Sequence, residues 1–381
     1  MMSEAAPDPL DVLMVASSFP SDADDWRAVF MRELANALGR QAAIQLRIWA
    51  PPGDTGPGVE HVLQSDDANW LSRLMREGGI AHLLRTRPLY AGLVAAGLLR
   101  RLRRSYLGNA DIDLRHVNWL QNALALPDDR KPLVVTALGS DLALLRYAPI
   151  RWAVRRLLKR RPAIVCPNAG WMVTPLRGAL GGDIDIREVP FGIDAIWYDL
   201  TRAPLQTPHR WLAVTRLTSG KLGDLFAWAA PYFEDDRRHL DLIGPMQEAV
   251  DIPEWVHYHG PATPAQLCEH WFPSATGLIT LSRHAEGRPQ VMLEAMAAGL
   301  PIIASDIDAH ASFLRHDETA WLCNSPGHFR DGLLRLENAD SNTVIGEAAR
   351  NWARSTIGTW NDCAARYLAL YRELLELPPR D

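Results

Sequence analysis

Two glutamates lie eight positions apart in one segment of the sequence, and their surroundings suggest chemistry. Glu294 is the only charged residue in the apolar stretch 290–298, which Pro289 precedes and Gly299 follows. Proline favours the first turn of a helix and glycine the position after its end, so this stretch predicts a short, buried helix. A buried carboxylate without hydrogen-bond donors is too costly to keep ionised, so Glu294 is expected to have a polar partner. The alternative is that Glu294 faces solvent and that Glu286 is an ordinary loop charge.

The segments on either side of this helix predict that it connects two buried strands. Residues 277–282 form a short apolar run typical of a buried strand, residues 283–288 form a polar loop, and residues 301–305 form the next strand. Glu286 therefore lies in the loop that leads into the helix. The first turn of a helix offers amide donors and the positive end of the helix dipole, which favour a phosphate. A ligand rich in hydroxyls, with a phosphate, is the chemistry that this segment favours.

The order of these residues resembles a known signature. Its parts are Glu286–Gly287, residues 294–297 (EAMA), Gly299 and Pro301. Together they are similar to the E-x7-E motif of glycosyltransferase family 4, whose members are retaining enzymes that use nucleotide sugars. The resemblance implies an α/β protein of the GT-B fold, with two Rossmann-like parallel-sheet domains that face each other across a cleft. It also implies that Glu294 binds the donor ribose and Glu286 the transferred sugar. The further donor-binding positions are Gly287, Arg288, Pro289, Gln290 and Val291.

Two cations earlier in the sequence suit the same substrate. Arg216 ends the predicted strand 211–216, and Lys221 follows five positions later, after a turn that contains Gly220. Ligands of α/β proteins bind at the carboxyl ends of parallel strands, where two cations suit a diphosphate leaving group. The pair resembles the family's Arg-Leu…Lys pattern, although Leu222 stands where the family usually has glycine. Taken alone, both residues would be surface charges.

Two further segments are consistent with this arrangement. Residues 239–245 and 256–261 predict strands that end in glycine turns. In similar enzymes the backbone near Gly260 lies against the nucleobase. Residues 188–194 (EVPFGID) resemble the Pro-Asn-Gly-Val-Asp hinge of the family, with Phe191 in place of asparagine, or they form an ordinary turn.

The first half of the sequence predicts a parallel sheet of its own. Residues 11–16 and 44–50 form apolar strands around a helix at 27–38, and such a β-α-β unit implies parallel pairing. In the family, the loop after the first strand is rich in glycine. Here it begins with Ser17 and Ser18 and has no glycine pair. We expect these two serines on the acceptor side of the cleft.

His116 and Asp141 are candidates for the acceptor side and for catalysis. His116 lies near the end of the predicted strand 113–119, where similar enzymes have a histidine that lines the cleft; otherwise it is a core or surface residue. Asp141 follows the strand 132–137 and opens a helix, so it is either a catalytic residue at the carboxyl edge of the sheet or a plain N-cap. The family often has a histidine just before this Gly-Ser-Asp turn, and Leu138 takes its place.

Length and composition limit the possibilities. A chain of 381 residues predicts two domains: residues 1–195 for the acceptor, with helix 359–378 packing back on them, and residues 205–355 for the nucleotide sugar. A net charge of −5 argues against a general nucleic-acid binder. The four cysteines lie far apart without metal-ligand spacing, which favours reduced thiols in the cytoplasm. Neither a signal peptide nor a membrane span is expected.

Basic residues concentrate in the first half of the sequence. From 69 to 107, arginines alternate with leucines and Trp70 at helical spacing, with breaks at Gly78–Gly79 and Pro88, and a second basic stretch covers 146–161. These helices either cover a core with their arginines in water or rest on an anionic lipid surface or acceptor. The apolar residues expected among the charges are Trp70, Leu71, Leu74, Leu83, Leu84, Leu98 and Leu99.

Together these features predict a retaining hexosyltransferase that moves a sugar from a UDP- or GDP-linked donor to a glycan or lipid-linked acceptor, in cell-envelope or exopolysaccharide synthesis. The expected catalytic residues are Arg216, Lys221, Glu286 and Asp141. No metal or other cofactor is expected, because two cations and a helix N-terminus can neutralise a diphosphate. The alternatives are a nucleotide-sugar epimerase or hydrolase, a non-catalytic nucleotide-sugar-binding subunit, and a glucan phosphorylase or synthase. The expected location is the cytoplasm, including the inner face of the cytoplasmic membrane.

Overall fold

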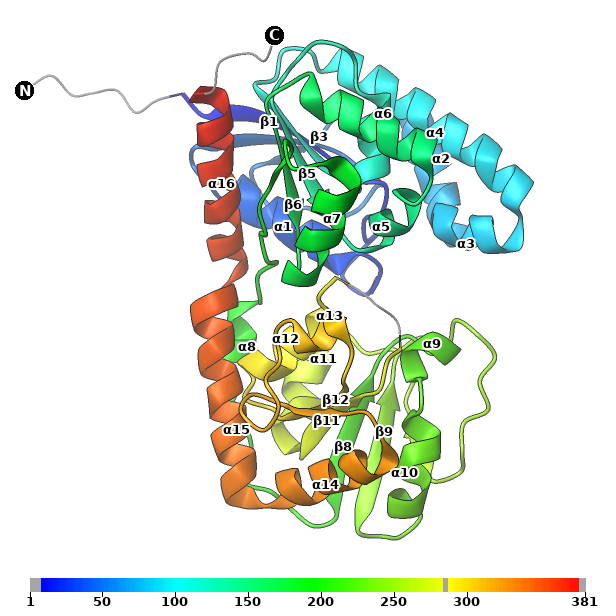
Figure 1. Cartoon of the computed structure of the whole chain (residues 1–381), viewed down its shortest axis with the longest axis vertical. Coiled ribbons are helices and arrows are strands. Elements are labelled where there is room, and N and C mark those ends of the chain that lie inside the picture. The colour runs from blue at the N-terminus through cyan, green and yellow to red at the C-terminus, as the bar shows by residue number, and fades with distance from the viewer. Residues whose placement is uncertain (1–7, 284–286, 377–381) are drawn as a thin grey trace, which may run out of the picture. The chain divides into compact units, whose positions relative to one another are not determined.

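The chain folds into two α/β units, each with its own parallel sheet. The computed structural model describes residues 8–283 and 287–376. Unit 1 comprises residues 1–191 and 360–381, and unit 2 comprises residues 192–359. In each unit the helices cover both faces of the sheet (Figure 1). The predicted α/β class with two parallel sheets is therefore confirmed.

The sheet of unit 1 has seven strands in the order β3-β2-β1-β4-β5-β6-β7, and all neighbouring pairs are parallel. The strands are β1 Leu10–Val15, β2 Ile44–Trp49, β3 Val59–His61, β4 Leu114–Asn118, β5 Leu133–Ala137, β6 Ala163–Pro167 and β7 Asp185–Ile186. Every residue of β4, β5 and β6 is buried. Strands covered on both faces have continuous apolar runs rather than alternating ones, which is why their sequences predicted them.

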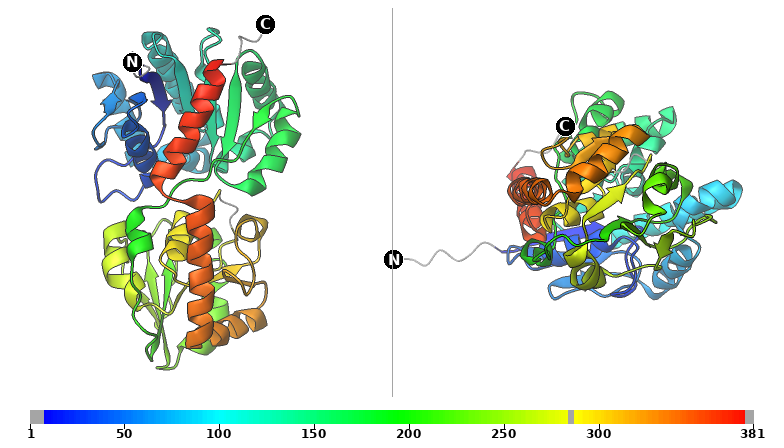
Figure 2. Two further views of the ribbon diagram at one scale, coloured as in Figure 1. Left: turned by 90° about the vertical axis from the view of Figure 1, so that its left-hand side faces the viewer. Right: turned by 90° about the horizontal axis from the view of Figure 1, so that it is seen from below.

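Two layers of helices enclose this sheet. One face packs against α1 (Val29–Gly39) and α16 (Trp360–Glu376), and Figure 2 (left) shows α16 in red along that face. The other face packs against α4 (Pro88–Gly108), α6 (Ala148–Lys159) and α7 (Val173–Leu180). The remaining helices of unit 1 are α2 Ser65–Arg76, α3 Gly79–Thr86 and α5 Ser140–Leu144, with 3-10 turns η1 Leu120–Ala125 and η2 Gly170–Met172.

The basic stretch after residue 64 forms three helices with the predicted breaks. α2 ends at Arg76, α3 begins at Gly79, and α4 begins at Pro88. Gly78 and Gly79 have φ angles of +82° and +76°, which glycine adopts without the penalty of a side chain. No helix in the described parts of the chain is both long and apolar enough to cross a membrane.

The sheet of unit 2 has six strands in the order β10-β9-β8-β11-β12-β13, again with parallel pairs. The strands are β8 His209–Val214, β9 Arg238–Ile243, β10 Val256–Tyr258, β11 Gly277–Thr280, β12 Ile302–Ser305 and β13 Trp321–Cys323. The loops that follow β8, β9, β10 and β11 therefore leave the sheet at one edge. This carboxyl edge carries most of the donor residues that the sequence predicted.

Helices also cover both faces of the second sheet. One face packs against α8 (Ala195–Asp199), α12 (Gln290–Ala297) and α15 (Ala339–Trp352). The other packs against α9 (Ser219–Leu222), α10 (Leu225–Phe233) and α14 (Pro326–Glu337). The shorter helical segments are α11 Pro264–Gln266, η3 Leu267–Trp271, η4 Phe272–Ser274, α13 Asp308–Ala311 and η5 Ala353–Ile357.

Candidate active site

The helix α12 holds the first group of candidate residues. It begins at Gln290, directly after Pro289, and Gly299 follows its end with a φ angle of +66°. The helix contacts α8, α15 and β12, and its buried residues are Met292, Leu293, Ala295, Met296 and Ala297. The predicted buried helix is therefore confirmed. Its apolar sides fix it in the core of unit 2, so the position of its one carboxylate is fixed as well.

Glu294 is half-buried on this helix. Burial, together with the like charge of the nearby Asp194 carboxylate, raises the pKa of its carboxyl to about 8. No hydrogen bond from the described residues lowers that pKa. The sequence predicted a polar partner for Glu294; in the described parts of the chain, the side chain is desolvated and the charged group near it is the Asp194 carboxylate. A ligand that donates hydrogen bonds to Glu294 would stabilise its ionised form.

The N-terminus of α12 adds backbone donors beside Glu294. The side-chain amide of Gln290 donates to the carbonyl oxygen of Gly192 at 2.9 Å, which orients the first residue of the helix. The Arg288 guanidinium lies 5.4 Å from the ring centre of Phe313. Glu286, the other predicted acid, lies outside the described residues. The first turn of α12 follows directly after Pro289, and the start of a helix leaves amide donors available for a ligand.

Arg216 and Lys221 follow the end of β8. Both side chains are half-buried. Thr218 caps the short helix α9, and its hydroxyl accepts a hydrogen bond from the amide of Lys221 at 3.3 Å. The two cations therefore belong to one ordered turn at the carboxyl edge of the sheet, as the sequence predicted for their backbone positions.

This turn is joined to the loop that leads toward α12. The amide of Arg283 donates to the carbonyl oxygen of Gly220 at 2.9 Å. At Gly223 the φ angle is +56°, and a Cβ atom there would lie 1.9 Å from the carbonyl oxygen of Leu281. Leu222 stands where the resembling family usually has glycine, but the glycine that this close approach requires is the next residue, Gly223. The sequence therefore does contain a glycine for this turn, one position after the place where the family has it.

The loops after β9 and β10 complete the same edge. The amide of Gly244 donates to the carbonyl oxygen of Gly260 at 2.8 Å, and the Tyr258 hydroxyl donates to the carbonyl oxygen of Gly244 at 3.0 Å. A Cβ atom on Gly244 would lie 1.8 Å from the carbonyl oxygen of Thr215. Gly260 is therefore bonded to the loop next to the Arg216 turn, and the carboxyl edge of unit 2 is one connected set of turns.

His116, a predicted acceptor-side residue, lies in the core of unit 1. Its Nδ1 is 2.6 Å from the Tyr371 hydroxyl, and its Nε2 is 2.7 Å from the Thr136 hydroxyl. Burial lowers the pKa of His116 to about 3, so the imidazole is neutral near pH 7. The structure thus places His116 under α16, in the core position that the sequence left open as the alternative to the cleft.

Asp141, a predicted catalytic residue, is also fully buried. Its carboxylate accepts a hydrogen bond from the amide of Leu120 at 3.1 Å and another from the amide of Leu138 at 3.2 Å. These bonds tie the turn after β4 to the turn after β5. The geometry gives Asp141 a positioning role, because its oxygens already serve the backbone and have no exposed surface.

Ser17 and Ser18, predicted on the acceptor side, are half-buried in the loop after β1. The Ser17 hydroxyl accepts a hydrogen bond from the side chain of Asn122 at 3.2 Å. The same amide group donates to the carbonyl oxygen of Asn118 at 2.8 Å, and Asn118 itself donates to the carbonyl oxygen of Val15 at 3.1 Å. These two buried asparagines were not among the residues that the sequence predicted. The sequence feature that could have revealed them is a pair of asparagines four residues apart, at the end of a predicted strand.

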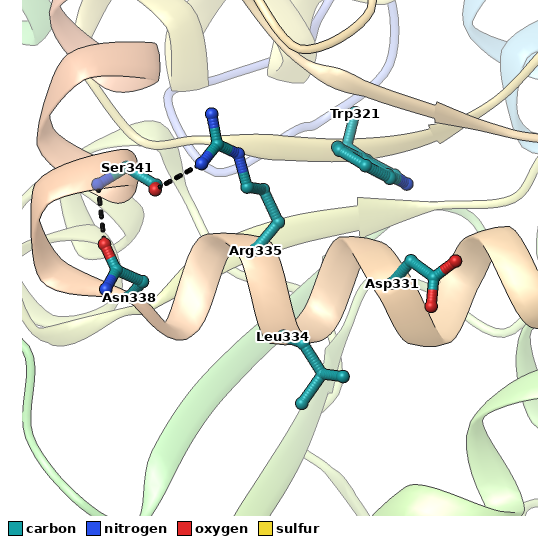
Figure 3. Close-up of a pocket in the computed structure, with 6 residues that line it drawn as sticks. All are labelled: Trp321, Asp331, Leu334, Arg335, Asn338 and Ser341. Carbon is teal, nitrogen blue, oxygen red and sulfur yellow. Dashed lines mark hydrogen bonds between the residues drawn. The ribbon is translucent and has the colours of Figure 1, made fainter.

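An open cavity of about 510 Å³ lies elsewhere on unit 2 (Figure 3). Its lining residues are Trp321, Asp331, Leu334, Arg335, Asn338 and Ser341. Trp321 is the first residue of β13, so this cavity adjoins the amino edge of the sheet, opposite the edge that carries Arg216. Across the part of the chain that the structure describes, no group of three or more histidine, cysteine or acidic side chains is arranged to hold a metal ion.

Comparison with solved structures identifies the fold. Sucrose-phosphate synthase from Thermosynechococcus elongatus is 17% identical with a TM-score of 0.70, and the alignment covers 96% of this chain and 99% of that one. A glycosyltransferase from Rickettsia africae is 13% identical with a TM-score of 0.66, covering 98% and 100%. Anabaena HepE, solved with UDP and glucose, is 14% identical with a TM-score of 0.63, covering 94% and 99%. The chain therefore has the GT-B fold.

Sequence comparison adds the class of enzyme. Residues 208–338 match the family described as "Glycosyl transferases group 1". The matched segment contains all six strands of unit 2 together with Arg216, Lys221 and Glu294. No curated protein matches the sequence. A group 1 match on a GT-B fold makes this protein a glycosyltransferase.

Proposed function

We propose that the protein transfers a hexose from a UDP- or GDP-linked donor to a glycan or lipid-linked acceptor, with retention of anomeric configuration. The observation that carries this proposal is Glu294: a half-buried carboxyl with a pKa of about 8, beside the N-terminus of α12. Ribose offers a pair of adjacent hydroxyls, and both can donate to one carboxylate. A nucleotide whose ribose binds Glu294 has its phosphates near the helix amides, where negative charge is favoured.

In this proposal Arg216 and Lys221 bind the diphosphate. Both cations lie on the turn that is bonded through Gly220 to the segment leading to α12. As the bond between the sugar C1 and the phosphate oxygen breaks, negative charge grows on the leaving diphosphate. Fixed cations and amide donors stabilise that charge more in the transition state than in the ground state, and this difference accelerates the reaction. Glu286 holds hydroxyls of the transferred sugar in the same proposal.

The transfer step needs no protein nucleophile. The acceptor hydroxyl attacks C1 on the face that the leaving group departs from, and its proton passes to the leaving phosphate oxygen. One C–O bond breaks and one forms, and the configuration at C1 is retained because attack and departure take place on the same face. Asp141 contributes by fixing the turns after β4 and β5, with its carboxylate bonded to Leu120 and Leu138. Ser17 and Ser18, at the carboxyl edge of unit 1, are the proposed acceptor-side residues.

A panel of UDP-, GDP- and ADP-sugars, followed by product analysis with the strongest binder, tests this function. At least one nucleotide sugar should raise the melting temperature, and Glu294→Ala should weaken its binding by about 1–3 kcal/mol, the range for lost hydrogen bonds to a charged group. Unchanged nucleotide affinity in the folded variant would contradict the ribose assignment. Release of free sugar and nucleotide with every glycan acceptor tried would favour a hydrolase, and a changed sugar still attached to nucleotide would favour an epimerase.

A further inference from the structure

The helices α3 and α4 lie at the rim of unit 1 (Figure 1). They carry an exposed apolar patch. Leu89 and Leu93 on α4 are 90% and 74% exposed. Tyr90 on α4 and Leu84 on α3 are exposed as well. Single exposed leucines are ordinary on protein surfaces, but four large apolar side chains within residues 84–93 form a patch. We call Leu84, Leu89, Tyr90 and Leu93 the rim patch.

The inner sides of these helices are already packed. Leu74, Leu83, Ala91 and Val94 form a small core of their own, apart from the core that covers the sheet. This packing corrects the sequence prediction of the apolar surface residues. Of the seven residues predicted there, Leu71, Leu74, Leu83 and Leu98 are buried, and Trp70 lies under the Arg101 guanidinium at 4.5 Å. Only Leu84 belongs to both the predicted set and the rim patch.

Arginines flank the rim patch, and one acidic side chain also touches it, since the Tyr90 hydroxyl donates to the Glu77 carboxylate at 3.4 Å. Residues 79–108 contain six arginines and no aspartate or glutamate. Leu89, Leu93 and Ala96 form one exposed stripe of α4, and Arg100 and Arg103 continue it at the same helical spacing. With a rise of about 1.5 Å per residue, Arg100 lies about 10 Å along the helix from Leu93. Arg100 therefore lies about two helical turns beyond the last leucine of the patch, on the same side of α4.

We propose that the rim patch docks on an anionic lipid bilayer. Leu84, Leu89, Tyr90 and Leu93 enter the boundary between headgroups and acyl chains, and Arg87 and Arg100 bind headgroup phosphates. Arginine suits this position, because it pairs with phosphate through two parallel hydrogen bonds while its aliphatic stem stays against apolar groups. The surface makes no use of Arg216, Lys221 or Glu294, so it is independent of the proposed transfer reaction.

Charge argues against a second copy of this chain as the occupant. Two copies joined symmetrically through the rim patch would bring two arginine rows together, and like charges at close range are unfavourable. An acidic protein would satisfy the charges, but it would also need a groove or pocket for the leucines. A bilayer needs neither, since its surface is negative and its interior accepts any apolar side chain.

Vesicle co-sedimentation of the full chain tests the proposal. Phosphatidylcholine vesicles are compared with vesicles that also contain phosphatidylglycerol, over a series of salt concentrations. One variant combines Leu89→Ser with Leu93→Ser, and a second combines Arg87→Gln with Arg100→Gln. The matched control is Leu334→Ser on α14, because Leu334 is also an exposed leucine, at 57%, but belongs to unit 2. All of these side chains are exposed, so the melting temperatures should stay close to that of the wild type.

The wild type and Leu334→Ser should bind only the vesicles with phosphatidylglycerol, and binding should fade as salt rises. Each double variant should lose about tenfold or more in partitioning. The proposal would be overturned if the wild type bound both kinds of vesicle equally, or if it bound neither at low salt. It would also be overturned if Leu334→Ser lost as much binding as the double variants. Self-association in sedimentation velocity that the leucine variant abolishes while vesicle binding is unchanged would overturn it as well. Nucleotide-sugar binding is measured on the same samples, so failure here is distinguishable from failure of the proposed transfer.

Discussion

Glu294 and Asp194 show how one residue's surroundings can prepare a site for a ligand. The apolar helix α12 removes water from Glu294, and Asp194, which caps α8 through a hydrogen bond from the amide of Ile196, adds like charge. Both effects favour the protonated carboxyl. Ribose hydroxyls that donate to this group would stabilise the carboxylate, so ribose binding would lower the pKa of Glu294.

The raised pKa predicts how stability depends on pH. The ordinary pKa of the glutamate carboxyl is 4.5, and in the fold it is about 8. The folded chain therefore binds more protons, so the free energy of unfolding falls as pH rises from about 4.5 through about 8. Glu294→Gln cannot ionise, and its melting temperature should exceed that of the wild type by a margin that grows between pH 5 and pH 8.5. A margin that stays constant, as expected for the exposed control Glu254→Gln, would contradict the assignment.

Arg216 and Lys221 should act on the rate rather than on binding alone. Replacing either with alanine should lower kcat by about tenfold or more, because each stabilises charge that develops in the transition state. The control is Arg315→Ala, since Arg315 is exposed and pairs only loosely with Glu318 at 3.7 Å. If kcat holds and only KM rises, the two cations bind the substrate without contributing to the chemical step.

His116 and Asp141 show where residue-level prediction stops. The sequence predicted the strand that carries His116 and the turn that carries Asp141, but both side chains are buried. The cover over His116 comes from Tyr371, which is 255 positions away in the sequence. Nothing near His116 in the sequence reveals that α16 reaches it. The sequence can therefore predict that a polar residue lies at the end of a strand. It does not predict whether the side chain points into the core or toward a ligand.

Among the elements, the turn after β8 depends on one glycine. Gly223→Ala would place a Cβ atom 1.9 Å from the carbonyl oxygen of Leu281, at a positive φ angle. The turn must shift away from the loop that leads to α12, which should lower stability by about 1–3 kcal/mol and weaken nucleotide binding several-fold. Gly220→Ala is the matched control in the same turn, because a Cβ atom there meets nothing within 4 Å. Equal effects of the two substitutions on melting and affinity would refute this role.

The elements themselves could largely be predicted from the sequence. Apolar runs bounded by glycine and proline predicted the strands, because parallel strands are covered on both faces and their sequences show it directly. The breaks at Gly78–Gly79 and Pro88 followed from backbone chemistry. The outer face of α3 and α4 could not be predicted, since leucines lie on both the covered and the exposed sides of these helices. Which leucines are covered depends on the small core that α2, α3 and α4 form together.

For the whole molecule, the proposed chemistry predicts activity without a bound metal. Arg216, Lys221 and the amides at the start of α12 supply positive charge for the diphosphate, as a divalent cation would in other sites. Treatment with EDTA followed by removal of the chelator should leave the transfer rate within about twofold of its starting value. A loss of tenfold or more that magnesium or manganese restores would show that a metal ion takes part.

The most direct measurement is calorimetric titration of the best-binding nucleotide diphosphate into the wild type and Glu294→Gln, at pH 6.5 and pH 8.5. If ribose hydroxyls stabilise the Glu294 carboxylate, binding releases a proton from a group with a pKa of about 8. The wild type should then bind more tightly at the higher pH, by on the order of tenfold, beyond any change in the variant. The variant serves to subtract ionisation of the nucleotide's own phosphate. Equal affinities of the two proteins at pH 8.5, with the same dependence on pH, would contradict the account.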